Sequence, residues 1–78
     1  MTKKKATRTN VLQLACIVTD GEGVILSCSE SDENVELSVT GAYGSTLELL
    51  FDALVVLFGY SVIEGDFGDT FVYTIKKD

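Results

Sequence analysis

Alternation between apolar and polar residues is the feature that most limits how this chain can fold. The pattern runs through residues 24–29, 35–40 and 70–75, and it extends over residues 10–20 and 60–64. Successive side chains of a β-strand point to opposite faces of a sheet, so alternation predicts strands that bury one face. These five segments are therefore predicted to be strands.

One helix is predicted between the third and fourth strands. Ser45 followed by Glu48 matches a capping box, in which two side chains hydrogen-bond to backbone groups at a helix start. The helix is expected over residues 46–58, and Gly59 is placed to end it in the left-handed conformation. Residues 21–23 and 31–34 are expected to form turns. The predicted fold is α+β: an antiparallel sheet of four or five strands with one helix packed on a face, in the order β-β-β-α-β-β.

The chain is long enough for one small domain. Its 78 residues are 46% hydrophobic, and a domain of this size has a marginal core unless an oligomer or partner completes it. Residues 1–9 are expected to form a flexible basic arm and residues 10–78 a single α+β domain. The longest unbroken apolar run, residues 53–58, is too short to cross a membrane. No targeting segment is recognised, and the expected location is the cytoplasm.

The charges are distributed very unevenly along the chain. The net charge is −6, but all six lysine and arginine residues stand near the two ends of the sequence. Between Asn10 and Ile75 there is no lysine or arginine. That stretch carries eleven acidic residues: Asp20, Glu22, Glu30, Asp32, Glu33, Glu36, Glu48, Asp52, Glu64, Asp66 and Asp69. Such a body repels nucleic acids and anionic membranes and attracts basic protein surfaces. Its acids can form ion pairs only if a terminus folds back or another molecule supplies the cation.

The residues needed for catalysis or metal binding are missing or badly spaced. The chain has no histidine, so the commonest general base and the imidazole metal ligands are absent. The acids near Asp66 and near Asp20 do not have the spacing of a calcium loop. Cys16 and Cys28 lie in alternating apolar segments, which favours reduced core residues. We therefore expect no enzyme activity, no cofactor and no metal.

Acidic turns and an aromatic residue are the candidate partner-binding features. Phe67 stands between glycines and acids, where it either folds back under the sheet or is presented as an anchor for a basic groove. Tyr43, between two glycine-containing turns, is a second candidate anchor. The predicted partner-binding residues are Glu30, Asp32, Glu33, Glu36, Asp66, Phe67 and Asp69.

The predicted helix has more apolar surface than one small sheet covers. Glu48 and Asp52 are its only charged residues, one turn apart. Either the helix lies deep between the sheet and the C-terminal segment, or part of it contacts another chain. The second interpretation predicts self-association through Asp52, Val55 and Val56.

In size, in its uninterrupted acidic body and in its lack of catalytic residues, the chain resembles the small phage-encoded anti-defence proteins of the anti-CRISPR and anti-restriction type. The resemblance is one of class and rests on no family motif, so no functional residues are carried over. It implies a non-catalytic inhibitor that blocks a nucleic-acid-binding site on a larger defence protein by contacting its basic surface. The alternative is a small homodimeric structural or adaptor module, joined through the helix or through edge strands.

Overall fold

The computed structural model describes residues 5–77 of the chain. Two helices and a four-stranded antiparallel sheet follow one another in the order α-β-β-α-β-β. The elements are α1 (Arg8–Val18), β1 (Ile25–Glu30), β2 (Asn34–Thr40), α2 (Gly44–Asp52), which continues into a π-helical turn (Ala53–Leu57), β3 (Val62–Phe67) and β4 (Thr70–Lys76). The predicted α+β class is confirmed, whereas the predicted order β-β-β-α-β-β is wrong.

The error lies in residues 10–20, which were predicted as a strand and form most of α1 instead. Seven of the eight residues from 11 to 18 are apolar, so a period of two and a helical period both fit the segment. The side chains that the fold buries are Val11, Leu14 and Ala15, which have helical spacing. The expected hairpin at residues 21–23 and the three-stranded meander are wrong for the same reason.

The start of α1 is capped by a threonine inside the segment assigned to the basic arm. The Thr7 side chain accepts a hydrogen bond from the backbone N–H of Asn10 at 3.1 Å, which satisfies one of the free donors of the first turn. Arg8 and Thr9 then belong to the helix itself. Residues 1–4 of the predicted arm lie outside the described residues.

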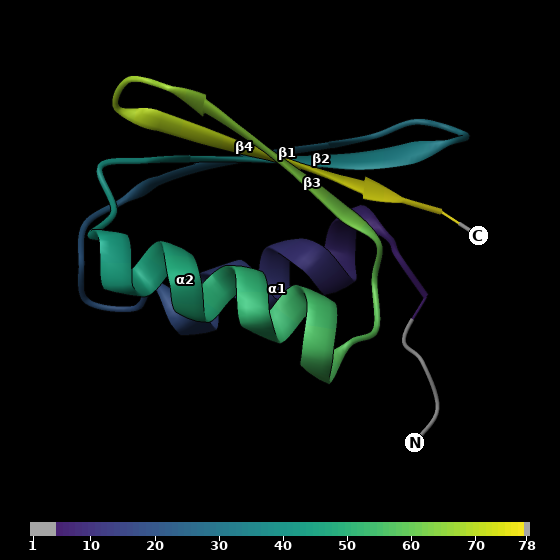
Figure 1. Ribbon diagram of the computed structural model, residues 1–78, viewed down its shortest axis with the longest axis horizontal. Coiled ribbons are helices and arrows are strands. Elements are labelled where there is room, and N and C mark those ends of the chain that lie inside the picture. Colours follow the sequence, from purple (N-terminus) through teal and green to yellow (C-terminus); the bar gives the residue numbers. More distant parts are fainter. Residues whose placement is uncertain (1–4, 78) are drawn as a thin grey trace.

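The strands lie side by side in the order β1-β2-β4-β3, with the longest pairing between β2 and β4 in the centre. Both helices cover the same face of this sheet, and they run in opposite directions (Figure 1). The predicted alternation is confirmed in β1, β2 and β4. The residues that point toward the helices include Leu26, Cys28, Val35, Leu37, Val39, Phe71, Tyr73 and Ile75.

The second helix begins differently from the prediction and changes to π-helical hydrogen bonding before its end. Tyr43 is its N-cap and makes no side-chain capping hydrogen bond, so the capping box of Ser45 and Glu48 does not form. After Asp52 the helix widens into the π-helical turn, in which the Phe58 N–H donates to the Ala53 carbonyl at 3.0 Å. Gly59 has φ of 75°, which confirms its predicted role as the left-handed terminator.

The core lies between the sheet and the two helices. Leu37, Leu50, Leu54 and Tyr73 are among its largest fully buried side chains. The Tyr73 hydroxyl donates a hydrogen bond to the Leu47 carbonyl of α2 at 3.3 Å. Burial, with a contribution from Glu64, raises the pKa of Tyr73 to about 12. Within residues 5–77, no helix combines the length and apolar character of a membrane span.

Candidate binding surfaces

The sheet has two ends that differ in charge. At one end lie the β1–β2 turn and the described parts of both termini; at the other lie the α1–β1 loop, the start of α2 and the β3–β4 turn (Figure 1). The described cations all belong to the first end, which we call the basic end: Lys5, Arg8, Lys76 and Lys77. We call the opposite end the acidic end. It carries Asp20, Glu22, Asp66 and Asp69 and no described lysine or arginine.

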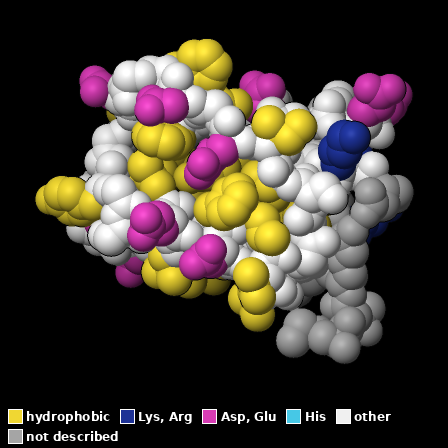
Figure 2. Space-filling view, viewed as in Figure 1, with side chains coloured by type: hydrophobic (Ala, Val, Ile, Leu, Met, Phe, Trp, Pro, Cys, Tyr) yellow, Lys and Arg dark blue, Asp and Glu magenta, His cyan; other side chains and the backbone are white. Residues whose placement is uncertain are grey.

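Most of the carboxylates are open to solvent. Ten of the eleven acids between residues 10 and 75 are exposed, Glu22 being the exception. Among the described residues, Glu30 and Lys77 form the one ion pair. Figure 2 shows acidic side chains spread over the visible face, around hydrophobic side chains that lie between the sheet and α2. The acidic surface is thus almost wholly unneutralised by the described part of the chain.

Glu30, a predicted partner-binding residue, is engaged within the fold. One carboxylate oxygen accepts a hydrogen bond from the Arg8 backbone N–H at 2.7 Å, at the first residue of α1, and the other pairs with Lys77. The bond from Lys77 and that from Arg8 hold the pKa of Glu30 below its usual range. A terminus does fold back here, and Glu30 joins the start of α1 to the end of the chain.

The other predicted residues near Glu30 lie around the β1–β2 turn. Asp32 and Glu33 are exposed within the turn, and the Glu33 carbonyl accepts a hydrogen bond from the Lys77 N–H at 2.9 Å. Glu36 is exposed on the sheet face that the helices leave uncovered. This acidic cluster therefore stands close to the cations of the basic end.

Asp66, Phe67 and Asp69 lie at the acidic end. The loop predicted over residues 65–69 is largely strand, because β3 continues through Phe67 and leaves Gly68 and Asp69 as the turn. Phe67 is 69% exposed on the uncovered face of the sheet rather than folded beneath it. Its ring lies over Gly65, where a Cβ would come within 2.9 Å of the ring carbon Cε2. The two predicted acidic groups are therefore at opposite ends of the molecule.

The residues predicted for self-association lie where α2 meets the π-helical turn. Asp52 and Val56 are exposed, whereas Val55 is half-buried. Leu49 and Leu57, which the sequence analysis did not select, are also exposed. The outer side of this helix thus combines apolar side chains with the carboxylates of Glu48 and Asp52.

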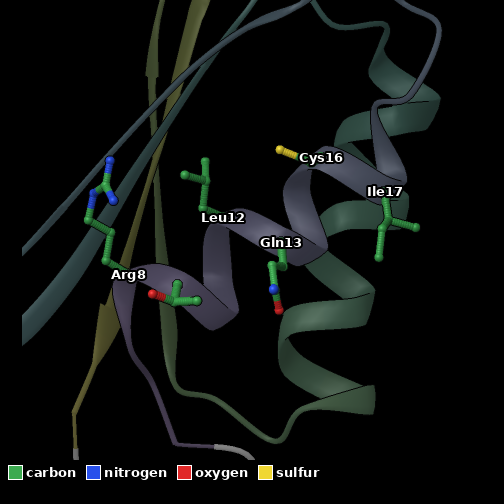
Figure 3. A pocket seen from close by; sticks show the side chains of 6 residues that line it. Arg8, Leu12, Gln13, Cys16 and Ile17 are labelled. Carbon is green, nitrogen blue, oxygen red and sulfur yellow. The ribbon is translucent and has the colours of Figure 1, made fainter.

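A shallow groove of about 650 Å³ runs along the outer side of α1. Its lining includes Leu12, Gln13, Cys16 and Ile17, and every lining residue comes from this one helix (Figure 3). Within residues 5–77, no second element closes the groove and no group of charged side chains converges on it. It has the character of an uncovered helix face rather than a ligand pocket.

The sequence analysis missed a carboxylate at the start of α2. Glu22 of the α1–β1 loop accepts a hydrogen bond from the Thr46 hydroxyl in the first turn at 2.7 Å. Its other oxygen is buried without a hydrogen-bond partner in the described part of the chain. Neither helix has an acid in its own first turn, and in each case a distant glutamate takes that place. The only sign of these contacts in the sequence is that the first turn of each helix has no acidic residue of its own.

Among residues 5–77, no three side chains of the metal-ligating types stand close enough to hold an ion. Cys16 and Cys28 are both free thiols, and burial raises the pKa of the Cys28 thiol. Comparison with known protein families and with curated proteins gives no match.

Proposed function

We propose that the protein is a non-catalytic inhibitor that binds the basic, nucleic-acid-binding surface of a larger defence protein, as anti-CRISPR proteins do. The observation that carries the proposal is the acidic end, where exposed carboxylates gather with no described cation. Unpaired carboxylates attract the lysine and arginine side chains that line a nucleic-acid channel.

The acidic end also offers aromatic anchors. Tyr43 is 71% exposed at the start of α2, and Phe67 is exposed at the end of β3. Aromatic side chains near the centre of an interface often contribute most of its binding energy, while surrounding charges speed and orient the encounter. Phe67 stands beside Asp66 and Asp69 in the chain, and Tyr43 follows Gly41, whose N–H donates to the Asp69 carbonyl at 3.2 Å. The basic end is less suited to the role, because its own cations compete for the carboxylates.

The proposal is tested by adding the protein to a panel of RNA-guided nucleases and restriction endonucleases and measuring DNA binding and cleavage. We expect inhibition of at least one enzyme, and a loss of inhibition in the double variant Asp66→Asn/Asp69→Asn. The matched control is Asp32→Asn/Glu33→Gln, which removes two charges at the basic end and should still inhibit. Inhibition that survives loss of the acidic-end charges, or no inhibition across the panel, would count against the proposal.

A further inference from the structure

No element of the described chain covers one face of the sheet, because both helices pack on the other (Figure 1); we call it the bare face. Three rows of side chains cross it, each contributed by β1, β2, β4 and β3 in turn. The first row is Ile25, Thr40, Thr70 and Phe67; the second is Ser27, Ser38, Val72 and Gly65; the third is Ser29, Glu36, Thr74 and Ile63. Glu36 is the only charged residue among these twelve, although 23% of the whole chain is charged.

This bare face carries apolar side chains at its margins. Ile25, Ile63 and Phe67 are each more than 60% exposed. A hollow of about 300 Å³ lies beside Ile63, Phe67 and Val72, and the acidic residues Glu36 and Glu64 also line it. A surface with one charge in its three central rows, and with apolar projections beside a hollow, is suited to contact with another protein surface.

We propose that the bare face is the contact surface between two copies of this chain. Self-contact through the outer side of α2 or through the sheet edges is opposed by charge. At the outer side of α2, a symmetric contact would bring Glu48 and Asp52 near their own copies with no cation between them. At the β1 edge of the sheet, the Arg8 guanidinium donates a hydrogen bond to the Cys28 carbonyl at 2.9 Å. The opposite edge strand, β3, carries Glu64 and Asp66. Charges so placed prevent strand addition.

The register of the sheet indicates how two copies fit. A two-fold axis that runs across the strands, above the second row, places the first row of one copy over the third row of the other. Phe67 then faces Ile63 and the hollow beside it. Lys76, one row beyond Thr74, faces the β3–β4 turn that contains Asp69. The acidic end of each copy therefore lies against the basic end of the other.

The same arrangement provides a partner for Glu36, the one charged residue within the three rows. Glu36 lies over Thr40 of the second copy, whose hydroxyl is 2.8 Å from that of Thr70. Two hydroxyls that share one hydrogen bond leave a second hydrogen free to donate to a carboxylate. An axis parallel to the strands would instead place acidic end against acidic end. Charge complementarity therefore selects the axis across the strands.

The size of the face indicates a weak dimer. Four strands of six residues span about 20 by 20 Å, or roughly 400 Å² on each copy. Stable interfaces bury about 800 Å² on each partner, so the two copies are in rapid exchange with the monomer. Phe67 is then available to a target whenever the dimer separates. The dimer proposal does not depend on the proposed inhibitory function.

Sedimentation equilibrium of the pure full-length chain over a wide range of concentrations tests this proposal. We expect a reversible monomer–dimer equilibrium that Ile63→Lys shifts to monomer. Val56→Lys is the matched control, because it adds the same charge on α2, and its dimer should persist. Far-ultraviolet circular dichroism confirms that each variant is folded.

A charge swap separates the proposed arrangement from any other dimer. Lys76→Asp and Asp69→Lys should each weaken association, because each places like charges opposite one another. In the double variant the positive and negative charges have exchanged places, so opposite charges face one another again. Its association should therefore match that of the original chain. A chain that is monomeric at every concentration, a dimer disrupted by Val56→Lys but not by Ile63→Lys, or a double variant weaker than both single variants would overturn the proposal.

Discussion

The two ends of the sheet carry similar side chains that serve different purposes. At the basic end, Glu30 is held by Arg8 and Lys77 and fixes the start of α1. At the acidic end, Asp66 and Asp69 are exposed and have no cation among the described residues. An acidic residue therefore cannot be assigned to a partner surface by its charge alone, because the fold already uses both carboxylate oxygens of Glu30.

The helix starts show the same difference between the ends. The first turn of α1, at the basic end, has both the Thr7 cap and the Glu30 carboxylate. The first turn of α2, at the acidic end, has no side-chain cap on its backbone, and Glu22 reaches it through the Thr46 hydroxyl. The basic end is thus the more completely bonded of the two, and the acidic end retains more free polar groups.

The largest expected effect comes from the core that joins the two ends. Leu37 is the middle residue of β2 and is fully buried. Replacing Leu37 with alanine should lower the free energy of unfolding by about 3 kcal/mol, because it removes buried methyl groups and leaves a cavity. Urea denaturation measures the change. The control Ile63→Ala, on the bare face, should cost far less, and equal losses would show that the two faces are not distinct.

A smaller effect should separate the two helix starts. Thr7→Ala should cost about 1 kcal/mol, because the Asn10 N–H loses its acceptor. Ser45→Ala should change stability by only a few tenths of a kcal/mol, because Ser45 makes no capping bond. Thermal or urea unfolding of both variants provides the comparison. A larger loss for Ser45→Ala than for Thr7→Ala would support the capping box and contradict the structure.

The smallest effect is expected for Glu30, whose ion pair is open to solvent and weakened by it. Its pKa is lowered from the usual 4.5 in the folded state, so the ionised carboxylate stabilises the fold above that pH. This contribution is lost as the pH falls below the usual value and through the lowered pKa. Glu30→Gln should therefore unfold more easily than the original chain at neutral pH, and the gap should narrow in acid. A pH-independent gap would exclude the carboxylate as its cause.

The sequence is sufficient to predict the parts of the fold in which a single period is visible. In β2 and β4 one face is buried, in β1 it is half-buried, and the opposite face is not covered by a helix, so the alternation of apolar and polar residues is clear. Gly59 was predictable because a helix end requires a residue that tolerates positive φ. Residues 11–18 were not predictable in this way, because Leu12, Cys16 and Ile17 face outward and are apolar as well.

Long-range contacts explain why the candidate site was only partly predictable. Glu30 and Lys77 are 47 residues apart in the chain, and no local pattern indicates that they meet. The division of the acids between two ends likewise depends on the pairing of β2 with β4, which places one hairpin turn at each end. Composition indicated an acidic surface, and only the topology shows which part of it lies away from the cations.

The most direct test of this account is a titration of the ¹⁵N-labelled protein with a short oligo-arginine peptide, followed by NMR. We expect the largest amide shifts to cluster at the acidic end, near Asp20, Phe67 and Asp69. Residues 31–33 should shift little, because Lys76, Lys77 and Arg8 stand close to them. Shifts concentrated on residues 31–33, or spread evenly over both ends, would contradict the claim that the acidic end is the binding surface.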